Sequence, residues 1–403
     1  MLEESKDITS GTDALALNPA PDHIPPPPER KLLAVFLVFL RLGFTAFGGP
    51  AAHISMFRQE FVARRKWLTD EQFLDLLGAT NLIPGPNSSE MAIHIGFLHA
   101  GWPGLIMGGL AFTLPAVLIV LVLSWAYVQF GTTPQADWLL YGIKPVMIAV
   151  IAQALWQLGR KTVNSRVAAL LGIGVVGLYF LGINEVMLIF LGGLSLMIIR
   201  NWKRLRDIKQ PHHLIFIPFL PVIGAAVVPL SMATLFLVFL KIGSILYGSG
   251  YVLVAFLRAD LVTRLGWLTE KQLIDAIAIG QITPGPLFTT ATFIGYLLAG
   301  VPGALIATLG IFLPSFVFVA ISNPLIPKLR RSIWAGSFLD GVIIASLGLM
   351  GAVGWQIGLV SIVDIPTAAI FAISLVLLLR FRLNSTWLIL LGAVVGIILY
   401  IFM

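Results

Sequence analysis

The residues of this sequence most able to do chemistry follow a tripeptide, Pro-Gly-Pro, that occurs twice. The first copy is Pro84, Gly85 and Pro86, and it precedes Asn87, Ser88, Ser89 and Glu90. The second copy is Pro284, Gly285 and Pro286, and it precedes Thr289 and Thr290. Because proline lacks an N–H group and clashes with the preceding turn, each tripeptide is expected to end one helix and start another. A helix start presents unsatisfied N–H groups and a partial positive charge, so with these hydroxyls it suits a small oxyanion.

Other polar residues in apolar surroundings could serve such a site. Arg41 and its counterpart Lys241 stand deep in apolar runs, and we expect them to attract the anion, with structural pairing as the alternative. Glu90, His94 and Asp340 are candidates for proton coupling. Glu90 could instead complete a capping box with Asn87, and a lone histidine is more often a packing residue. A simple packing kink is the alternative for each Pro-Gly-Pro, but both copies keep the tripeptide, which favours a binding site.

The other motif classes that indicate chemistry do not occur in the sequence. It has no cysteine, no P-loop, no nucleophile elbow, and no cluster of His, Asp and Glu with metal-ligand spacing. We therefore expect no catalytic residue, no metal and no cofactor.

The elements that must position these residues are membrane helices. Hydrophobic residues make up 58% of the 403 residues and charged residues only 11%, whereas soluble domains carry about 25% charged residues. Apolar runs of about 20 residues recur from residue 32 onward, without the alternation of an outer-membrane barrel. The net charge of +7 lies in short clusters between these runs, so it indicates topology rather than nucleic-acid binding. The chain is thus predicted to be an all-α polytopic membrane protein in contact with the lipid bilayer.

The two Pro-Gly-Pro copies belong to an internal repeat. Residues between Phe39 and Pro86 recur at an offset of 200, and those between Gly96 and Pro115 recur at 199. One residue was therefore gained or lost in the helix after the break. The predicted organisation is a disordered, proline-rich tail at 1–30, a first repeat at 31–200, a basic loop with a linking transmembrane helix at 201–231, and a second repeat at 232–403.

Charge placement predicts the relative orientation of the repeats. Basic clusters lie at 160–166, 200–209, 328–331 and 380–382, while the loops at 131–137, 182–184 and 359–365 carry no Lys or Arg. Placing the basic clusters and the N-terminus in the cytoplasm gives an odd number of crossings between the repeats and inverts the second one. Gly or Pro interrupts four segments, at 32–57, 70–100, 232–257 and 270–299. They are either full crossings, in a total of about 13 membrane segments, or re-entrant hairpins, which we favour for 32–57.

Inverted repeats with broken helices are typical of secondary transporters, which bind substrate near the midplane where half-helices meet. The sequences FGGP at 47–50, WLTDEQFLDLLGATNLIPGPNS at 67–88 and GWLTEKQLIDAIAIGQITPGP at 266–286 resemble the chromate ion transporter (CHR) family in its long, two-domain form. The resemblance covers residues 32–403. It implies an antiporter of the bacterial inner membrane that exports chromate, driven by the proton gradient, and so confers chromate resistance.

The resemblance also identifies motif residues in both copies. In the first copy they are Gly48, Gly49, Pro84, Gly85 and Pro86, and in the second they are Gly248, Pro284, Gly285 and Pro286. The second copy has YGSG in place of FGGP and lacks the Asn-Ser-Ser-Glu run. This difference favours one site built asymmetrically over two equivalent sites.

Alternative functions stay open at this point. The chain could carry sulfate or another tetrahedral oxyanion, because the same donors would bind any such dianion. A membrane enzyme or flippase acting on a lipid phosphate is less favoured, since the sequence shows no cluster of His, Asp and Arg in an interfacial loop. A channel would differ in lacking saturable, gradient-dependent flux. A homodimer also stays open.

Overall fold

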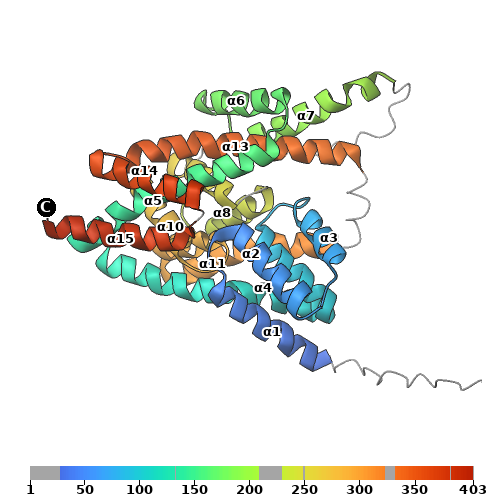
Figure 1. The fold of residues 1–403 in the computed structure, drawn as a ribbon, viewed down its shortest axis with the longest axis horizontal. Coiled ribbons are helices and arrows are strands. Elements are labelled where there is room, and N and C mark those ends of the chain that lie inside the picture. Colours follow the sequence, from blue (N-terminus) through green and yellow to red (C-terminus); the bar gives the residue numbers. More distant parts are fainter. Residues whose placement is uncertain are drawn as a thin grey trace, which may run out of the picture.

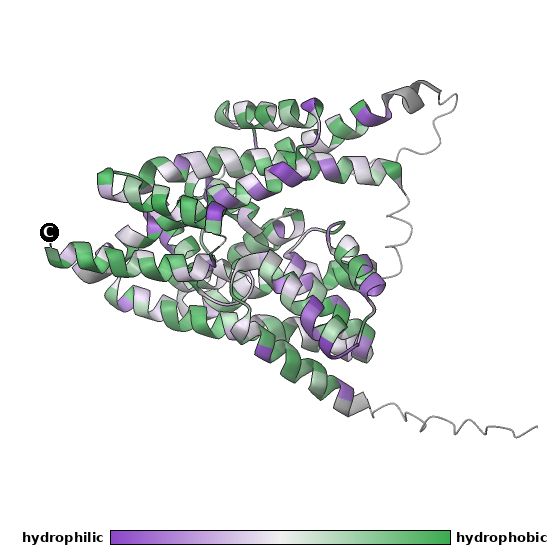
Figure 2. Ribbon diagram, in the orientation of Figure 1, coloured by the Kyte–Doolittle hydropathy of each residue, from purple (hydrophilic) through white to green (hydrophobic). Residues whose placement is uncertain are grey.

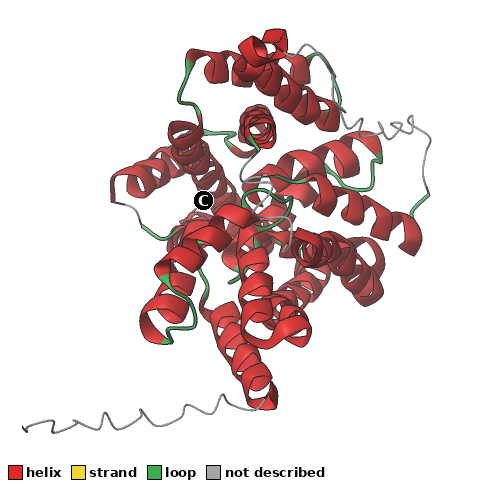
Figure 3. Ribbon diagram, turned by 90° about the vertical axis from the view of Figure 1, so that its right-hand side faces the viewer, coloured by secondary structure: helices red, strands yellow, loops and turns green. Residues whose placement is uncertain are grey.

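The protein is built from helices arranged around broken segments at its centre. The computed structural model describes residues 28–131, 133–207, 229–247, 250–322, 332–381 and 383–402. Within these residues the regular elements are all helical (Figures 1 and 3). The predicted tail at 1–30, apart from its last three residues, and most of the predicted linking helix lie outside the described residues.

The first repeat begins with a helical hairpin. α1 (Pro28–Thr45) is followed by α2 (Gly49–Phe57) and the π-helical turn η1 (Arg58–Arg64), which return along it. Phe39 of α1 contacts the rings of Phe57 and Phe61, with centroids 5.8 and 5.0 Å apart. The segment 32–57 therefore belongs to a helical hairpin, and its re-entrant character stays a prediction.

A second broken segment follows and leads into a long helix. α3 (Asp70–Thr80) runs to Pro-Gly-Pro, and α4 (Asn87–Phe130) starts directly after it. α4 reverses at Ala100 and Gly101, where Gly101 has φ 65 and ψ −151, a backbone conformation open essentially only to glycine. The two arms then pack closely, because Gly96 and Gly104 bring their backbones together. The repeat is completed by α5 (Pro134–Thr162), α6 (Arg166–Phe180) and α7 (Glu185–Asp207).

The second repeat has the same order of elements. They are α8 (Met232–Ile245), η2 (Gly250–Val252), α9 (Leu253–Leu257), η3 (Arg258–Arg264), α10 (Glu270–Ile282), η4 (Leu287–Thr289), α11 (Thr290–Ser322), α13 (Ile333–Ser361), α14 (Ile365–Phe381) and α15 (Ser385–Phe402). α11 reverses at Ala299 and Gly300, one residue earlier relative to Pro-Gly-Pro than α4 does. The 3₁₀ turn η4 makes up the length of the missing residue along the helix axis. A 3₁₀ helix rises about 2.0 Å per residue and an α-helix about 1.5 Å, so the three residues of η4 add about 1.5 Å, the rise of one α-helical residue.

Contacts between the repeats show how they are related. Ile148 of α5 lies beside Gly358 of α13, and Gly159 lies beside Leu347, so these two equivalent helices run antiparallel. The central loops exchange matching hydrogen bonds: the Gly85 N–H donates to the Leu246 carbonyl and the Gly285 N–H to the Ala46 carbonyl, both with N···O distances of 2.8 Å. An approximate two-fold axis therefore relates the repeats, and the second repeat is inverted.

The motif W-L-T-x-x-Q, which recurs in both repeats, has a local structural role. Thr69 accepts a hydrogen bond from the Gln72 N–H while the Gln72 side chain accepts one from the Thr69 N–H, which forms a capping box at the start of α3. Thr269 and Gln272 form the same box at the start of α10. The motif thus fixes where the helix leading to each Pro-Gly-Pro begins.

Within the described residues, six helical segments are long and apolar enough to cross a membrane, namely Asn87–Phe130, Asp137–Thr162, Glu185–Trp202, Leu287–Ser322, Ile333–Ser361 and Ser385–Phe402. α6, α8 and α14 are shorter apolar helices. Hydrophobic residues cover most of the long helices (Figure 2). The protein is therefore a multi-pass membrane protein, while the total of about 13 segments stays a prediction.

Candidate functional site

A small cavity lies where the interrupted segments of both repeats meet. It has a volume of about 40 Å³, the space of roughly three water molecules, which is the size range of a small inorganic anion. Seven residues singled out from the sequence line it: Gly48, Gly49, Pro86, Asn87, Ser88, Gly285 and Pro286. The cavity is also lined by His53, Tyr251, Gln281, Thr283 and Ser385, which no sequence pattern singled out. Gly248 lies outside the described residues.

Two half-helices start at this cavity. α4 begins at Asn87 with Pro86 as its N-cap and no side-chain cap, so its first N–H groups have no partner within the helix. The helix formed by η4 and α11 begins in the same way after Pro286. The capping box considered for Glu90 is wrong, because Asn87 lies inside the helix and its Nδ2 donates to Oδ1 of Asn81 at 2.8 Å.

His53 of α2 links the two helix starts. Its Nε2 lies 2.9 Å from the Ala46 carbonyl and its Nδ1 lies 3.0 Å from Oγ of Ser88. A carbonyl only accepts, so Nε2 donates to it, and in the neutral ring Nδ1 accepts the hydrogen of the Ser88 hydroxyl. The same Ala46 carbonyl accepts the N–H of Gly285. A buried chain of hydrogen bonds therefore joins the start of α4 to the second Pro-Gly-Pro.

The internal repeat offers a control for this histidine. The counterparts of His53 and Ser88 in the second repeat are Leu253 and Phe288, which are both buried. The same fold thus packs well with an apolar pair at these positions. The His53–Ser88 pair is not required by the architecture, which points to a role in the cavity.

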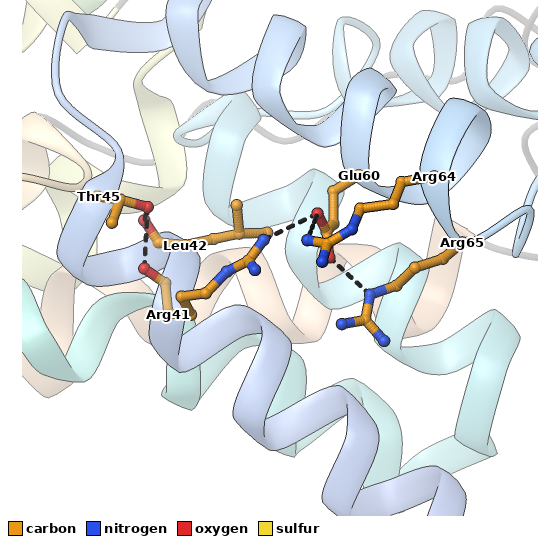
Figure 4. A network of polar contacts seen from close by, with 6 residues as sticks. All are labelled: Arg41, Leu42, Thr45, Glu60, Arg64 and Arg65. Carbon is orange, nitrogen blue, oxygen red and sulfur yellow. Dashed lines mark hydrogen bonds and ion pairs between the residues drawn. The ribbon is translucent and has the colours of Figure 1, made fainter.

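The deep cations predicted to attract the anion are paired with carboxylates instead. Arg41 donates to Glu60 of η1 at 2.8 Å, and Glu60 also binds two further arginines, Arg64 at 3.2 Å and Arg65 at 2.6 Å (Figure 4). Glu60 lies outside the spanning helices. Burial raises the pKa of its carboxyl, but hydrogen bonds from Arg65 and Arg64 and the charge of Arg41 have a larger opposite effect. The pKa of Glu60 is therefore lowered from its ordinary value.

The second repeat contains an equivalent ion pair. Lys241 donates to Asp260 of η3 at 2.6 Å, and the two residues have the same separation in the chain as Arg41 and Glu60. Neither Arg41 nor Lys241 lines the central cavity. The geometry therefore favours structural pairing, the alternative considered from the sequence, and attraction of the anion by these two cations stays a prediction.

Several predicted residues are buried but do not line the cavity. Ser89, Glu90, His94, Thr289 and Thr290 are buried, and neither carboxylate oxygen of Glu90 has a hydrogen-bond partner among the described residues. Glu90 and Ser315 of α11 both approach Gly85: a methyl group on Gly85 would lie 2.2 Å from Oε1 of Glu90 and 2.6 Å from Oγ of Ser315.

Asp340 lies elsewhere, in a larger cavity of about 380 Å³ where it forms an ion pair with Arg200. Pro50 and Asn87 line both this cavity and the central one. The two cavities therefore share a wall at the start of α4.

Comparison with known proteins agrees with this architecture. The family model described as chromate transporter matches residues 33–197 and 233–397, one match for each repeat. The chain belongs to the chromate transporter family. It is 34% identical to a chromate transport protein of Cupriavidus metallidurans over 93% of this chain and 94% of the relative.

Other relatives of this transporter are similarly distant. A probable chromate transport protein of Synechococcus elongatus is 31% identical, over 94% of this chain and 98% of the relative. A chromate transport protein of Pseudomonas aeruginosa is also 31% identical, over 91% of this chain and 89% of the relative. No solved structure matches the chain. Membership of this family makes the protein a transporter rather than an enzyme.

Proposed function

We propose that this protein is a secondary active transporter that exports chromate across the inner membrane, coupled to the proton gradient, and so confers chromate resistance. The observation that carries the proposal is the central cavity, where two half-helix starts and the Ser88 side chain meet. Relatives that match this chain over most of their length are named chromate transport proteins. The N-terminus would then lie in the cytoplasm, with the basic loops.

Partial charges and N–H groups would hold the anion in this cavity. Each helix start contributes about half an elementary charge through its N–H groups. Among the described residues no Lys or Arg lines the cavity. A dianion held without a full countercharge binds weakly enough to be released on the other side, which suits a carrier.

Glu90 is the group best placed to couple transport to protons. It is fully buried, one turn into the half-helix that starts at the cavity. A carboxylate buried without a partner is costly, so it is stable there as the neutral acid and becomes charged when a countercharge or water reaches it. His94 lies one turn further along the same buried face. Asp340 has less support for this role, because Arg200 already compensates its charge.

A carrier for sulfate or another tetrahedral oxyanion is the second candidate. N–H and hydroxyl donors recognise oxygen atoms at tetrahedral spacing and do not distinguish the central atom. The lining of the central cavity is compatible with both substrates.

Uptake into everted membrane vesicles tests the proposal, because their cytoplasmic face points outward. Radiolabelled chromate is added with and without an acid-inside proton gradient, and with excess sulfate. Saturable, gradient-dependent accumulation that sulfate inhibits only weakly is expected. Equal inhibition by sulfate would favour the general oxyanion carrier, and no accumulation would refute chromate export.

A further inference from the structure

The larger cavity is bounded by the ends of helices that carry basic residues. α13 lies between α5 and α7 (Figure 1), and the cavity of about 380 Å³ is lined by residues of all three helices. Lys161 from the end of α5, Asn164 from the following loop and Arg200 near the end of α7 form its outer part. Asn81 lines this cavity too and hydrogen-bonds Asn87, which lines both this cavity and the central one.

The polar groups of this cavity suit an anion. Lys161 and Arg200 provide two positive charges against the one negative charge of Asp340. Ser346 of α13 also lines the cavity; it is buried, and its hydroxyl has no hydrogen-bond partner among the described residues. An oxyanion bound there could accept from this hydroxyl and compete with Asp340 for the Arg200 guanidinium.

The inverted repeat shows that the membrane protein can be built without these charges. At the repeat offset of 199, the counterparts of Lys161, Asn164 and Arg200 are Val360, Val363 and Leu399. The counterpart of Asp340 is Tyr141. The two repeats share their helices, but the second repeat carries no charge at the positions equivalent to Lys161, Asn164 and Arg200.

We infer that the cavity lined by Lys161, Arg200 and Asp340 is a second oxyanion site, an entrance site from which the anion passes by Asn87 into the central cavity. The inference rests on the proposed function and gives it a direction: the anion is loaded from the face that carries the basic loops. The Arg200–Asp340 ion pair opens when the incoming anion replaces the Asp340 carboxylate on Arg200. Asp340 therefore sets the affinity of the entrance by competition.

Initial rates in everted vesicles test the entrance site. Lys161→Gln and Arg200→Gln are each expected to raise the KM for chromate added outside by about tenfold, with the maximal rate unchanged, because a lost charge lowers the local anion concentration. Asp340→Asn is expected to lower this KM. Raising the ionic strength should raise the KM of the unmodified protein more than that of Arg200→Gln. Arg166→Gln removes a charge on the same face that does not line the cavity, and should leave KM unchanged.

A second measurement separates this role from a loss of structure. Vesicles preloaded with chromate report loading from the opposite face, where the variants should behave as the unmodified protein. Unchanged KM in both Gln variants, or an equal change from both faces, would overturn the entrance site while leaving the transporter intact. Absence of saturable transport by the unmodified protein would instead remove the proposed function, and the entrance site with it.

Discussion

Gly85→Ala is a severe test of the central cavity, because this position tolerates no side chain. Gly85 has φ 142, in the region that favours glycine. A methyl group there would lie 2.2 Å from Oε1 of Glu90 and 2.6 Å from Oγ of Ser315, well inside van der Waals contact. The Gly85 N–H also donates to the Leu246 carbonyl, so a displaced loop loses a bond between the repeats.

The loss of folding stability in Gly85→Ala follows from the backbone strain and the overpacking. Backbone strain at such a φ is about 1–3 kcal/mol, and overpacking of a buried site is about 1–3 kcal/mol. The expected destabilisation is therefore about 2–6 kcal/mol. Gly85→Ala should lower the temperature at which the solubilised protein loses its monodisperse elution, and it should abolish chromate uptake in vesicles.

Two comparisons make this result interpretable. Gly174→Ala in α6 adds a methyl group that meets nothing within 4 Å and should preserve both stability and uptake. Adding Glu90→Ala to Gly85→Ala removes the closest clash and should restore part of the thermal stability. Full stability and normal uptake of Gly85→Ala would refute the tight packing of Pro-Gly-Pro against Glu90, and with it the geometry on which the proposed site depends.

Three further substitutions probe the site and its support. His53→Leu introduces the residue found at the equivalent position of the second repeat, so the protein should elute normally while chromate uptake falls about tenfold or more; normal uptake would remove His53 from the site. Glu90→Gln should leave chromate binding nearly unchanged but make uptake insensitive to the proton gradient, whereas retained gradient dependence would exclude Glu90 as the coupling group. Glu60→Gln should lower stability at pH 7 by about 1–2 kcal/mol, since the arginines around it are partly exposed. The pKa of Glu60 is lowered in the fold. The ionised carboxylate therefore contributes its full share of folding stability above the ordinary carboxyl pKa, and this share is lost as the pH falls through the lowered pKa. The melting temperatures of the unmodified protein and Glu60→Gln should converge in acid.

Much of the architecture could be predicted because its signals are local and occur twice. Pro-Gly-Pro breaks a helix wherever it stands, and the shift of the repeat offset from 200 to 199 located the irregularity that the structure shows as η4. The basic clusters predicted inversion, because each cluster reports on one loop. The ion pair between α1 and η1 shows the limit of this approach: Arg41 was recognised as a deep cation, but its partner Glu60 was not.

Pairing across the fold needs the tertiary structure. Arg200 and Asp340 are 140 residues apart, and His53 and Ser88 are 35 apart on different helices. For Glu60 a signal did exist, because the charge of Arg41 and the charge of Glu60 both recur in the second repeat, as Lys241 and Asp260. A search for charge pairs conserved between the two halves would have found this pair. Such a search would have missed His53, whose counterpart is apolar.

The residues that differ between the repeats make the two faces of a nearly symmetric scaffold unequal. The shared elements are the broken helices, the capping boxes, the reciprocal loop hydrogen bonds and the ion pairs at η1 and η3. These hold the two half-helix starts at one cavity. The unshared residues are associated with the two cavities: His53 and Ser88 line the central cavity, Glu90 is buried one turn into α4, and Lys161 and Arg200 line the larger cavity. Two identical halves would bind a substrate equally from both faces. In the proposed transporter, a difference in affinity between the faces would therefore come from the positions where the repeats differ, while the proton gradient would set the direction of net transport.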